Sequence, residues 1–116
     1  MAISERDLQI IEKMQQYCVE IQEAHDQFQK SYDRFLNVSL YKNAVSLCLM
    51  QIGELSTHLS EKFKETYKNI PWKQIRGMRN VVAHEYGSID TEIVWETATE
   101  DIAEIEQFCK EILSLD

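Results

Sequence analysis

The chain has 116 residues, a formal net charge of −8, three glycines and one proline. This length suffices for one domain with a single core and excludes two ordinary domains, while the scarcity of turn residues beside abundant helix formers predicts an all-α fold. The negative charge argues against a broad basic face for general nucleic-acid binding, but it leaves room for a small basic site.

A first helix is predicted from Ser4, because Ser4 and Asp7 have the spacing with which a cap and an acidic side chain satisfy the free amides of a first turn. Core-type residues then recur at spacings of three and four: Ile11, Met14, Cys18, Ile21, His25 and Phe28. This pattern predicts an amphipathic helix of about seven turns. His25 is expected to be a core or interface histidine rather than a catalytic one. Asp33 and Asn37 indicate a break or a second cap after this helix.

Residues 43–59 are apolar nearly all round over the first half of the segment. The segment is therefore expected to be either the central helix or a helix shared with a second subunit. Residues 60–68 are more polar and predict a short helix followed by a turn, with His58 as a helix-end residue before it.

A fourth helix should cover residues 71–86, with Pro71 in the first turn, where a missing amide costs nothing, and Gly87 as the stop. Asp90 would then cap a fifth helix. The buried stripe of that helix is predicted to comprise Val94, Ala98, Ile102, Ile105, Cys109 and Ile112. Residues 1–116 should thus form one domain, an up-and-down bundle of four long helices and one short one.

Three cysteines, Cys18, Cys48 and Cys109, lie far apart within helical patterns. We predict buried, reduced thiols rather than a disulfide or a metal site. Neither an apolar run typical of a signal peptide nor the roughly 20 uncharged residues of a membrane span is found, so a cytoplasmic protein is expected.

The stretch GMRNVVAHEYG, residues 77–87, gathers four polar side chains on the fourth helix: Arg79, Asn80, His84 and Tyr86. On a wheel of about 100° per residue they border one stripe whose middle carries two small residues, Ala83 and Gly87. Such a stripe allows another backbone or a ligand to come close.

Lys73 and Arg76 add positive charge beside Arg79, so a local phosphate- or RNA-binding site is predicted in this acidic chain. Arginine with a histidine that exchanges protons near neutral pH suffices to cleave RNA without a metal. Arg79 and His84 diverge by roughly 140° on an ideal helix, so we favour a site completed by a two-fold-related subunit over a distorted helix. The residues alone also allow a structural role, in which Arg79 pairs with surface carboxylates and His84 borders a helix interface.

The ordered set Arg79, His84 and Tyr86 resembles the RxxxxHxY signature of the HEPN superfamily, specifically the HepT-like toxins of bacterial and archaeal toxin–antitoxin pairs. The strings IGE, PW, GMRN and HEY extend the resemblance over most of the chain. The resemblance implies a five-helix HEPN fold, a homodimer with the motifs at the subunit interface, and metal-independent ribonuclease activity without a cofactor.

By this match Arg79 and His84 would be the catalytic pair, while Asn80 and Tyr86 would support the substrate or its orientation. The resemblance also implies a minimal nucleotidyltransferase antitoxin, which in this family neutralises the toxin by transferring AMP to the motif tyrosine, here Tyr86. Glu54 could hold Arg79 or His84, or it could be an exposed glutamate at a helix end. Neither DNA nor a membrane is expected as a partner.

The main alternative function is a non-catalytic HEPN module that presents a nucleotide or substrate to the nucleotidyltransferase and uses Arg79 only to hold phosphate. A purely structural dimerisation partner is a third. The intact motif favours the toxin, because a binding module has no need of a titrating histidine. Trp72 and Trp95 are expected to anchor the core or an interface, with base stacking as the alternative.

Overall fold

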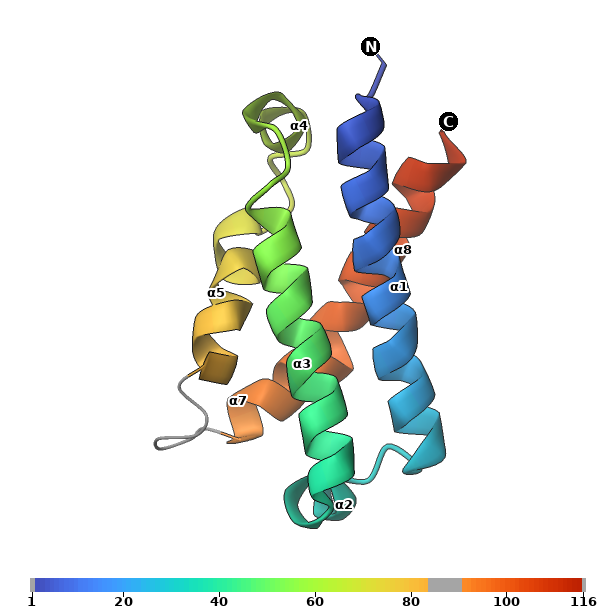
Figure 1. Ribbon diagram of the computed structural model, residues 1–116, viewed down its shortest axis with the longest axis vertical. Helices are drawn as coiled ribbons and strands as arrows, with labels where there is room; N and C mark the ends of the chain where they lie inside the picture. Colours follow the sequence, from blue (N-terminus) through green and yellow to red (C-terminus); the bar gives the residue numbers. More distant parts are fainter. Residues whose placement is uncertain (1, 84–90, 116) are drawn as a thin grey trace.

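The computed structural model describes residues 2–83 and 91–115, and all regular elements in these ranges are helical (Figure 1). The long helices are α1 (Glu5–Gln27), α3 (Ser39–Ser56), α5 (Trp72–Ala83) and α8 (Ile102–Ser114). The chain enters α8 through α7 (Thr91–Glu96) and a π-helical segment, η1 (Thr97–Asp101), which together form one continuous arm. Two short helices complete the described part of the chain: α2 (Tyr32–Asn37) and α4 (Glu61–Thr66).

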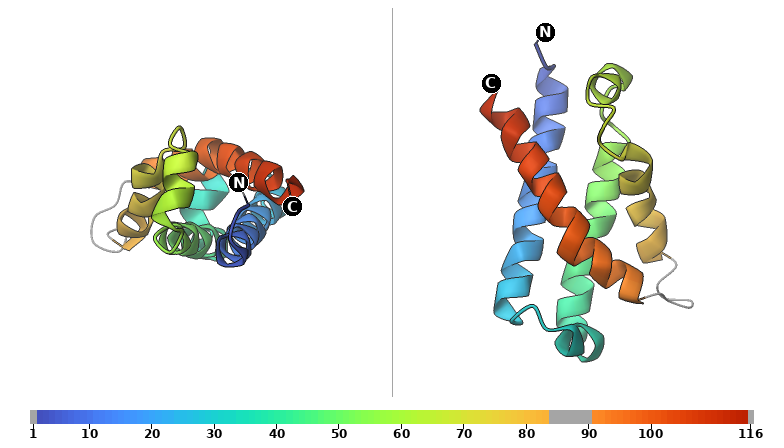
Figure 2. Two further views of the ribbon diagram at one scale, coloured as in Figure 1. Left: turned by 90° about the horizontal axis from the view of Figure 1, so that it is seen from above. Right: turned by 180° about the vertical axis from the view of Figure 1, so that it is seen from behind.

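The predicted all-α, up-and-down bundle is confirmed in these residues. Successive long elements run in opposite directions, and the arm of α7, η1 and α8 crosses diagonally behind α1 and α3 in the view of Figure 1 (Figure 2). Helix α1 packs against α3 and α8, whereas α5 packs mainly against α3. A second short helix, α2, occupies the region where Asp33 and Asn37 predicted a break, and Ser31 caps it through the amide of Arg34.

The starts of α1 and α4 are stabilised by short polar contacts. Ser4 caps α1 as predicted, with its hydroxyl accepting a hydrogen bond from the amide of Asp7 at 3.1 Å. The Asp7 carboxylate binds to the start of α4 rather than to its own helix. It accepts hydrogen bonds from the backbone amide of Ser60 at 2.9 Å and from the Ser60 hydroxyl at 2.6 Å. Since Ser60 is the N-cap of α4, buried Asp7 joins the first turns of two helices.

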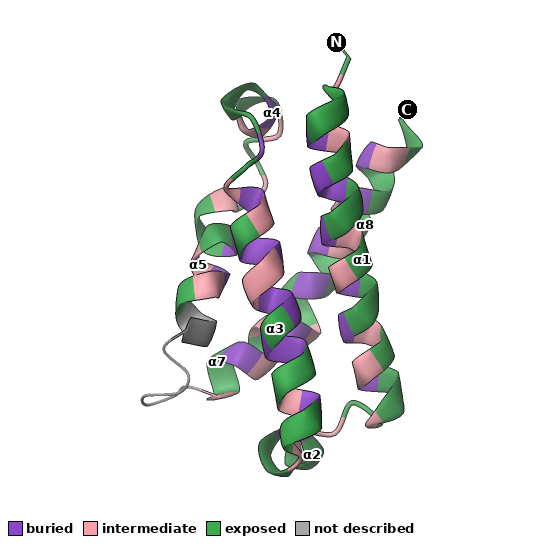
Figure 3. Ribbon diagram, in the orientation of Figure 1, coloured by how far each residue is buried: buried purple, intermediate pink, exposed green. Residues whose placement is uncertain are grey.

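The core lies between α1, α3 and the last arm, whose buried residues face inward (Figure 3). All six stripe residues predicted for the last helix are buried. The first three, Val94, Ala98 and Ile102, are spaced by four and four, which on a regular α-helix would rotate the stripe by about 80°. The wider turns of η1 take up this rotation, so the stripe continues to face the core.

His25 is a satisfied core histidine, one of the two roles predicted for it. Its side chain is buried, with Nε2 2.9 Å from the carbonyl oxygen of Ala98 in η1 and Nδ1 2.5 Å from the hydroxyl of Tyr41. A neutral imidazole that donates from Nε2 and accepts at Nδ1 satisfies both contacts. Burial lowers the pKa of His25, which favours this neutral form.

The three cysteines are buried and free, as predicted. Burial raises the pKa of Cys48 and of Cys109 to about 12, and it raises that of Cys18 further. Trp72 and Trp95 pack against the core, the first beside Phe63 and Phe108 and the second beside Phe35 and His25. None of the described helices is long and apolar enough to cross a membrane.

Candidate functional site

Helix α5 carries the residues predicted to bind phosphate. Ile75 and Met78 are buried on its inner side, while Lys73, Arg76 and Asn80 are exposed. His84 and Tyr86 lie outside the described residues, as do Gly87 and Asp90, so the predicted catalytic histidine, modified tyrosine and helix boundaries stay predictions.

The position of α5 is set by a close approach to α3 at Gly53. A Cβ atom on this glycine would lie 2.9 Å from the backbone nitrogen of Arg79 and 3.0 Å from the carbonyl oxygen of Ile75. Both are backbone atoms, so no side-chain rotation could relieve the clash. The absence of a side chain at Gly53 therefore allows the backbone of α5 to contact α3 at the level of Arg79.

At this contact Arg79 forms an ion pair with Glu54. Its Nη1 donates to Oε2 of Glu54 at 2.7 Å, and the two side chains remain 40% and 49% exposed. The hydrogen bond from Arg79 lowers the pKa of Glu54, so the carboxylate is ionised near neutral pH. His58, one turn further on, places its Nε2 3.6 Å from the other oxygen of Glu54.

Glu54 thus contacts Arg79, one of the two partners suggested for it, and it is also exposed near the end of α3, as the other interpretation required. The pair agrees with a structural role for Arg79 as well as with a catalytic one. Because the guanidinium presents five N–H donors and stays partly exposed, it retains donors for a second anion beside the carboxylate.

Lys73, Arg76 and Arg79 follow one another at intervals of three along α5 and form a diagonal basic row. Lys73 and Arg76 have no ion pair with any carboxylate in the described part of the chain. The charges of Lys73 and Arg76 are therefore free to attract an anion toward Arg79. This arrangement supports a local basic site on α5, while phosphate or RNA as its ligand stays a prediction.

Two contributors to this region were missed from the sequence. The sequence prediction gives Gly53 no role of its own, although a glycine within an apolar helix can indicate a close approach of two backbones. The sequence predicts His58 only as a helix-end residue, yet it contacts the same carboxylate as Arg79. Its four-residue spacing from Glu54 could have indicated this contact.

Comparison with known proteins places these residues in a family context. A family model described as Ribonuclease HepT-like matches residues 8–112. The chain is 36% identical over 76 residues to “Putative RNase MJ1380” of Methanocaldococcus jannaschii, covering 66% of this chain and 70% of that protein. It is 37% identical over 83 residues to “Putative RNase TTE0752” of Caldanaerobacter subterraneus, covering 72% and 74% of the two chains.

“Probable ribonuclease HepT” of Thermococcus cleftensis is 34% identical over 71 residues, which are 61% of this chain and 64% of that protein. No solved structure was found to match the chain.

Proposed function

Because the chain belongs to the ribonuclease HepT-like family, we propose that it is a metal-independent endoribonuclease and the toxin of a toxin–antitoxin pair. The observation that carries this proposal is the placement of Arg79. Its guanidinium is partly exposed, is positioned by Glu54, and stands at the end of a row of cations in a chain whose net charge is −8. A row of cations with unused N–H donors can bind the phosphates of an RNA strand.

In the proposed reaction the 2′-hydroxyl of the RNA attacks the adjacent phosphorus, a 2′-O–P bond forms, and the bond from phosphorus to the 5′-oxygen breaks. His84 exchanges the protons, by removing the one on the 2′-hydroxyl or by protonating the leaving oxygen. Arg79 stabilises the negative charge that builds on the phosphoryl oxygens. Asn80 orients the substrate, and Lys73 and Arg76 bind neighbouring phosphates.

Two copies of the chain are needed in this proposal. Arg79 and His84 are five residues apart in sequence, and on one regular helix they would diverge by roughly 140°. A two-fold-related subunit can supply the missing partner from its own copy of the motif. The regulatory partner is a minimal nucleotidyltransferase antitoxin, which transfers AMP to the hydroxyl of Tyr86.

The ribonuclease proposal is tested by incubating purified protein with total RNA in EDTA. Wild-type protein should cleave, whereas Arg79→Ala and His84→Ala should lower the rate on the order of 100-fold or more. Arg6→Ala, which removes an exposed arginine of α1, is the matched control and should cleave like the wild type. Equal cleavage by all four proteins would contradict the assignment, and the absence of cleavage of any RNA would favour the non-catalytic binding module.

The regulatory part is tested separately by mass spectrometry after coexpression with a neighbouring nucleotidyltransferase. A mass increase of one AMP group located on Tyr86, and lost in Tyr86→Phe, supports modification as the means of control. An unmodified Tyr86 in a fully neutralised complex would contradict it.

A further inference from the structure

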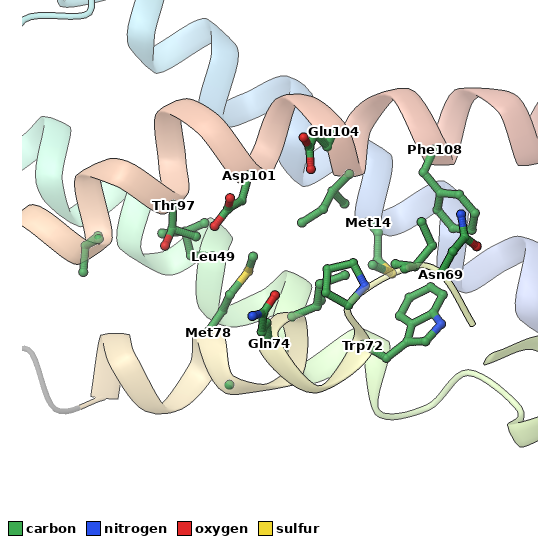
Figure 4. Close-up of a pocket in the computed structure, with 16 residues that line it drawn as sticks. Met14, Leu49, Asn69, Trp72, Gln74, Met78, Thr97, Asp101, Glu104 and Phe108 are labelled. Carbon is green, nitrogen blue, oxygen red and sulfur yellow. The ribbon is translucent and has the colours of Figure 1, made fainter. Parts of the chain in front are cut away.

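A cavity of about 590 Å³ lies between α5 and the arm formed by α7, η1 and α8 (Figure 4). Its floor is apolar and buried, with Met14 and Leu49 below, Ile75 on the α5 wall and Ile105 on the α8 wall. The volume falls within the range of about 300–1,000 Å³ that is usual for small-molecule sites. The cavity forms because α5 packs mainly against α3. The arm of α7, η1 and α8 leaves the other side of α5 largely uncovered.

One end of the cavity is aromatic. The rings of Trp72 and Phe108 line it, with their centroids 5.7 Å apart and their planes at 74°. The indole Nε1 of Trp72 donates to the carbonyl oxygen of Tyr67 at 3.1 Å, which holds the ring in place. A flat or aliphatic group can therefore pack against a fixed aromatic wall.

The rim of the cavity is polar and negatively charged. Asp101 and Thr97 extend from the η1 wall toward Gln74 and Met78 on the α5 wall, and Glu104 also lines the opening (Figure 4). None of the described lining residues is a lysine, an arginine or a histidine. Neither Asp101 nor Glu104 has an ion-pair partner among the residues that the structure describes.

We propose that this cavity binds a small organic cation, in which an apolar body fills the floor and an ammonium or related group lies between Asp101 and Glu104. An anion such as a nucleotide would be repelled by the two carboxylates. Both carboxylates are exposed at the rim and are solvated by water, so a neutral apolar molecule can fill the floor without using their charge. A hydrophobic cation gains an attraction to Asp101 and Glu104, while its apolar body packs against Trp72.

Two further observations support the charge requirement and the position. Desolvation raises the pKa of Asp101, and the charges of Glu104 and Glu96 raise it further, so a cation held beside these carboxylates would favour their ionised forms. The π-helical segment that carries Thr97 and Asp101 forms part of the wall, and π-helical turns occur frequently at functional sites. The site does not depend on ribonuclease activity, because it lies on the side of α5 away from Glu54.

The test titrates the full chain with 2-phenylethylammonium and follows amide chemical shifts by NMR. Two probes of similar size and shape, 2-phenylethanol and 3-phenylpropionate, separate charge from apolar packing. The cation should bind at one saturable site with shifts at Gln74, Gly77 and Thr97. The alcohol should bind about tenfold more weakly, and the anion should not bind measurably.

Variants then locate the site. Asp101→Asn combined with Glu104→Gln keeps the side-chain shapes and should weaken cation binding about tenfold, while binding of the alcohol stays the same. Glu100→Gln combined with Glu111→Gln removes two exposed carboxylates that do not line the cavity and should change nothing. Equal affinities for cation and alcohol, or cation binding that survives the first double variant, would overturn the proposal.

A filling variant gives an independent check. Gly77 lines the cavity, and a Cβ atom placed on it would meet nothing within 4 Å. Gly77→Leu should therefore place its side chain in the space and exclude both the cation and the alcohol. Undiminished cation binding in a folded Gly77→Leu protein would also overturn the proposal, and if this variant does not fold, the charge variants decide.

Discussion

The two sides of α5 differ in how closely they are packed. On the α3 side, backbone meets backbone at Gly53, and the Arg79–Glu54 ion pair lies at this contact. On the other side, a cavity of about 590 Å³ separates α5 from the last arm of the bundle. The contrast shows that one helix can hold an arginine side chain in place through a single contact face while its opposite face borders a cavity.

Among the described residues, each side of α5 is marked by one glycine, and the two glycines differ in how much space surrounds them. Gly53 belongs to α3 and lies where any side chain would strike the backbone of α5, whereas Gly77 belongs to α5 and has open space around it. Substitution of the two by alanine therefore measures how tightly each side is packed.

The largest effect is expected from Gly53→Ala. The new methyl group would lie within 3.0 Å of two backbone atoms, so α5 must shift away from α3. Overpacking of this kind lowers the free energy of unfolding by roughly 1–3 kcal/mol, more than alanine gains in helix propensity. Urea denaturation followed by circular dichroism measures the loss. A variant as stable as the wild type would show that α3 and α5 are not in tight backbone contact at Gly53.

The second largest effect is expected on the pH dependence of stability, through His25, which links α1 to η1 by its hydrogen bond to Ala98. Its folded-state pKa is lowered from the ordinary 6.5, so below pH 6.5 the unfolded chain binds a proton that the folded protein does not. Stability should therefore fall as the pH decreases from 6.5 toward the folded-state pKa, by at most about 1.4 kcal/mol per pH unit.

His25→Gln should remove this part of the pH dependence, whereas His58→Gln, at an exposed histidine, should keep it. Denaturant titrations at several pH values between 5 and 8 supply the comparison. Identical pH profiles for the wild type and His25→Gln would contradict a lowered pKa for His25 in the folded protein.

A smaller effect of opposite sign is expected from Gly77→Ala. The methyl group meets nothing, and alanine is favoured over glycine within a helix, so the free energy of unfolding should rise by roughly 0.5–1 kcal/mol. The same urea experiment applies. A loss of stability would mean that the open side of α5 is more crowded than the cavity indicates.

The smallest effect on stability is expected from Glu54→Gln. Its ion pair with Arg79 is about half exposed, and exposed pairs contribute little and are screened by salt. The melting temperature should match that of the wild type within error at high salt. A drop that persists there would show that the pair is a structural anchor of α5, which would favour the structural interpretation of Arg79.

Periodicity in the sequence predicted the long helices and their buried stripes, because a helix buried on one face has apolar residues at spacings of three and four. It did not predict that Asp7 binds Ser60, since these residues are 53 positions apart and only the packing of α1 near α4 brings them together. For the same reason the sequence predicted either a contact of Glu54 with Arg79 or His84, or an exposed glutamate at a helix end, without deciding between them. The π-helical segment is visible in the sequence as two four-residue steps from Val94 to Ile102, which a regular α-helix would not keep on one face.

The three buried thiols make the protein convenient for site-specific chemistry. Cys18, Cys48 and Cys109 are all buried, and their raised pKa values keep them in the unreactive thiol form near neutral pH. A maleimide dye should therefore leave the native chain unlabelled. One cysteine introduced at exposed Asn80 would then carry the dye alone, and its fluorescence could follow events at α5 without removal of any natural cysteine.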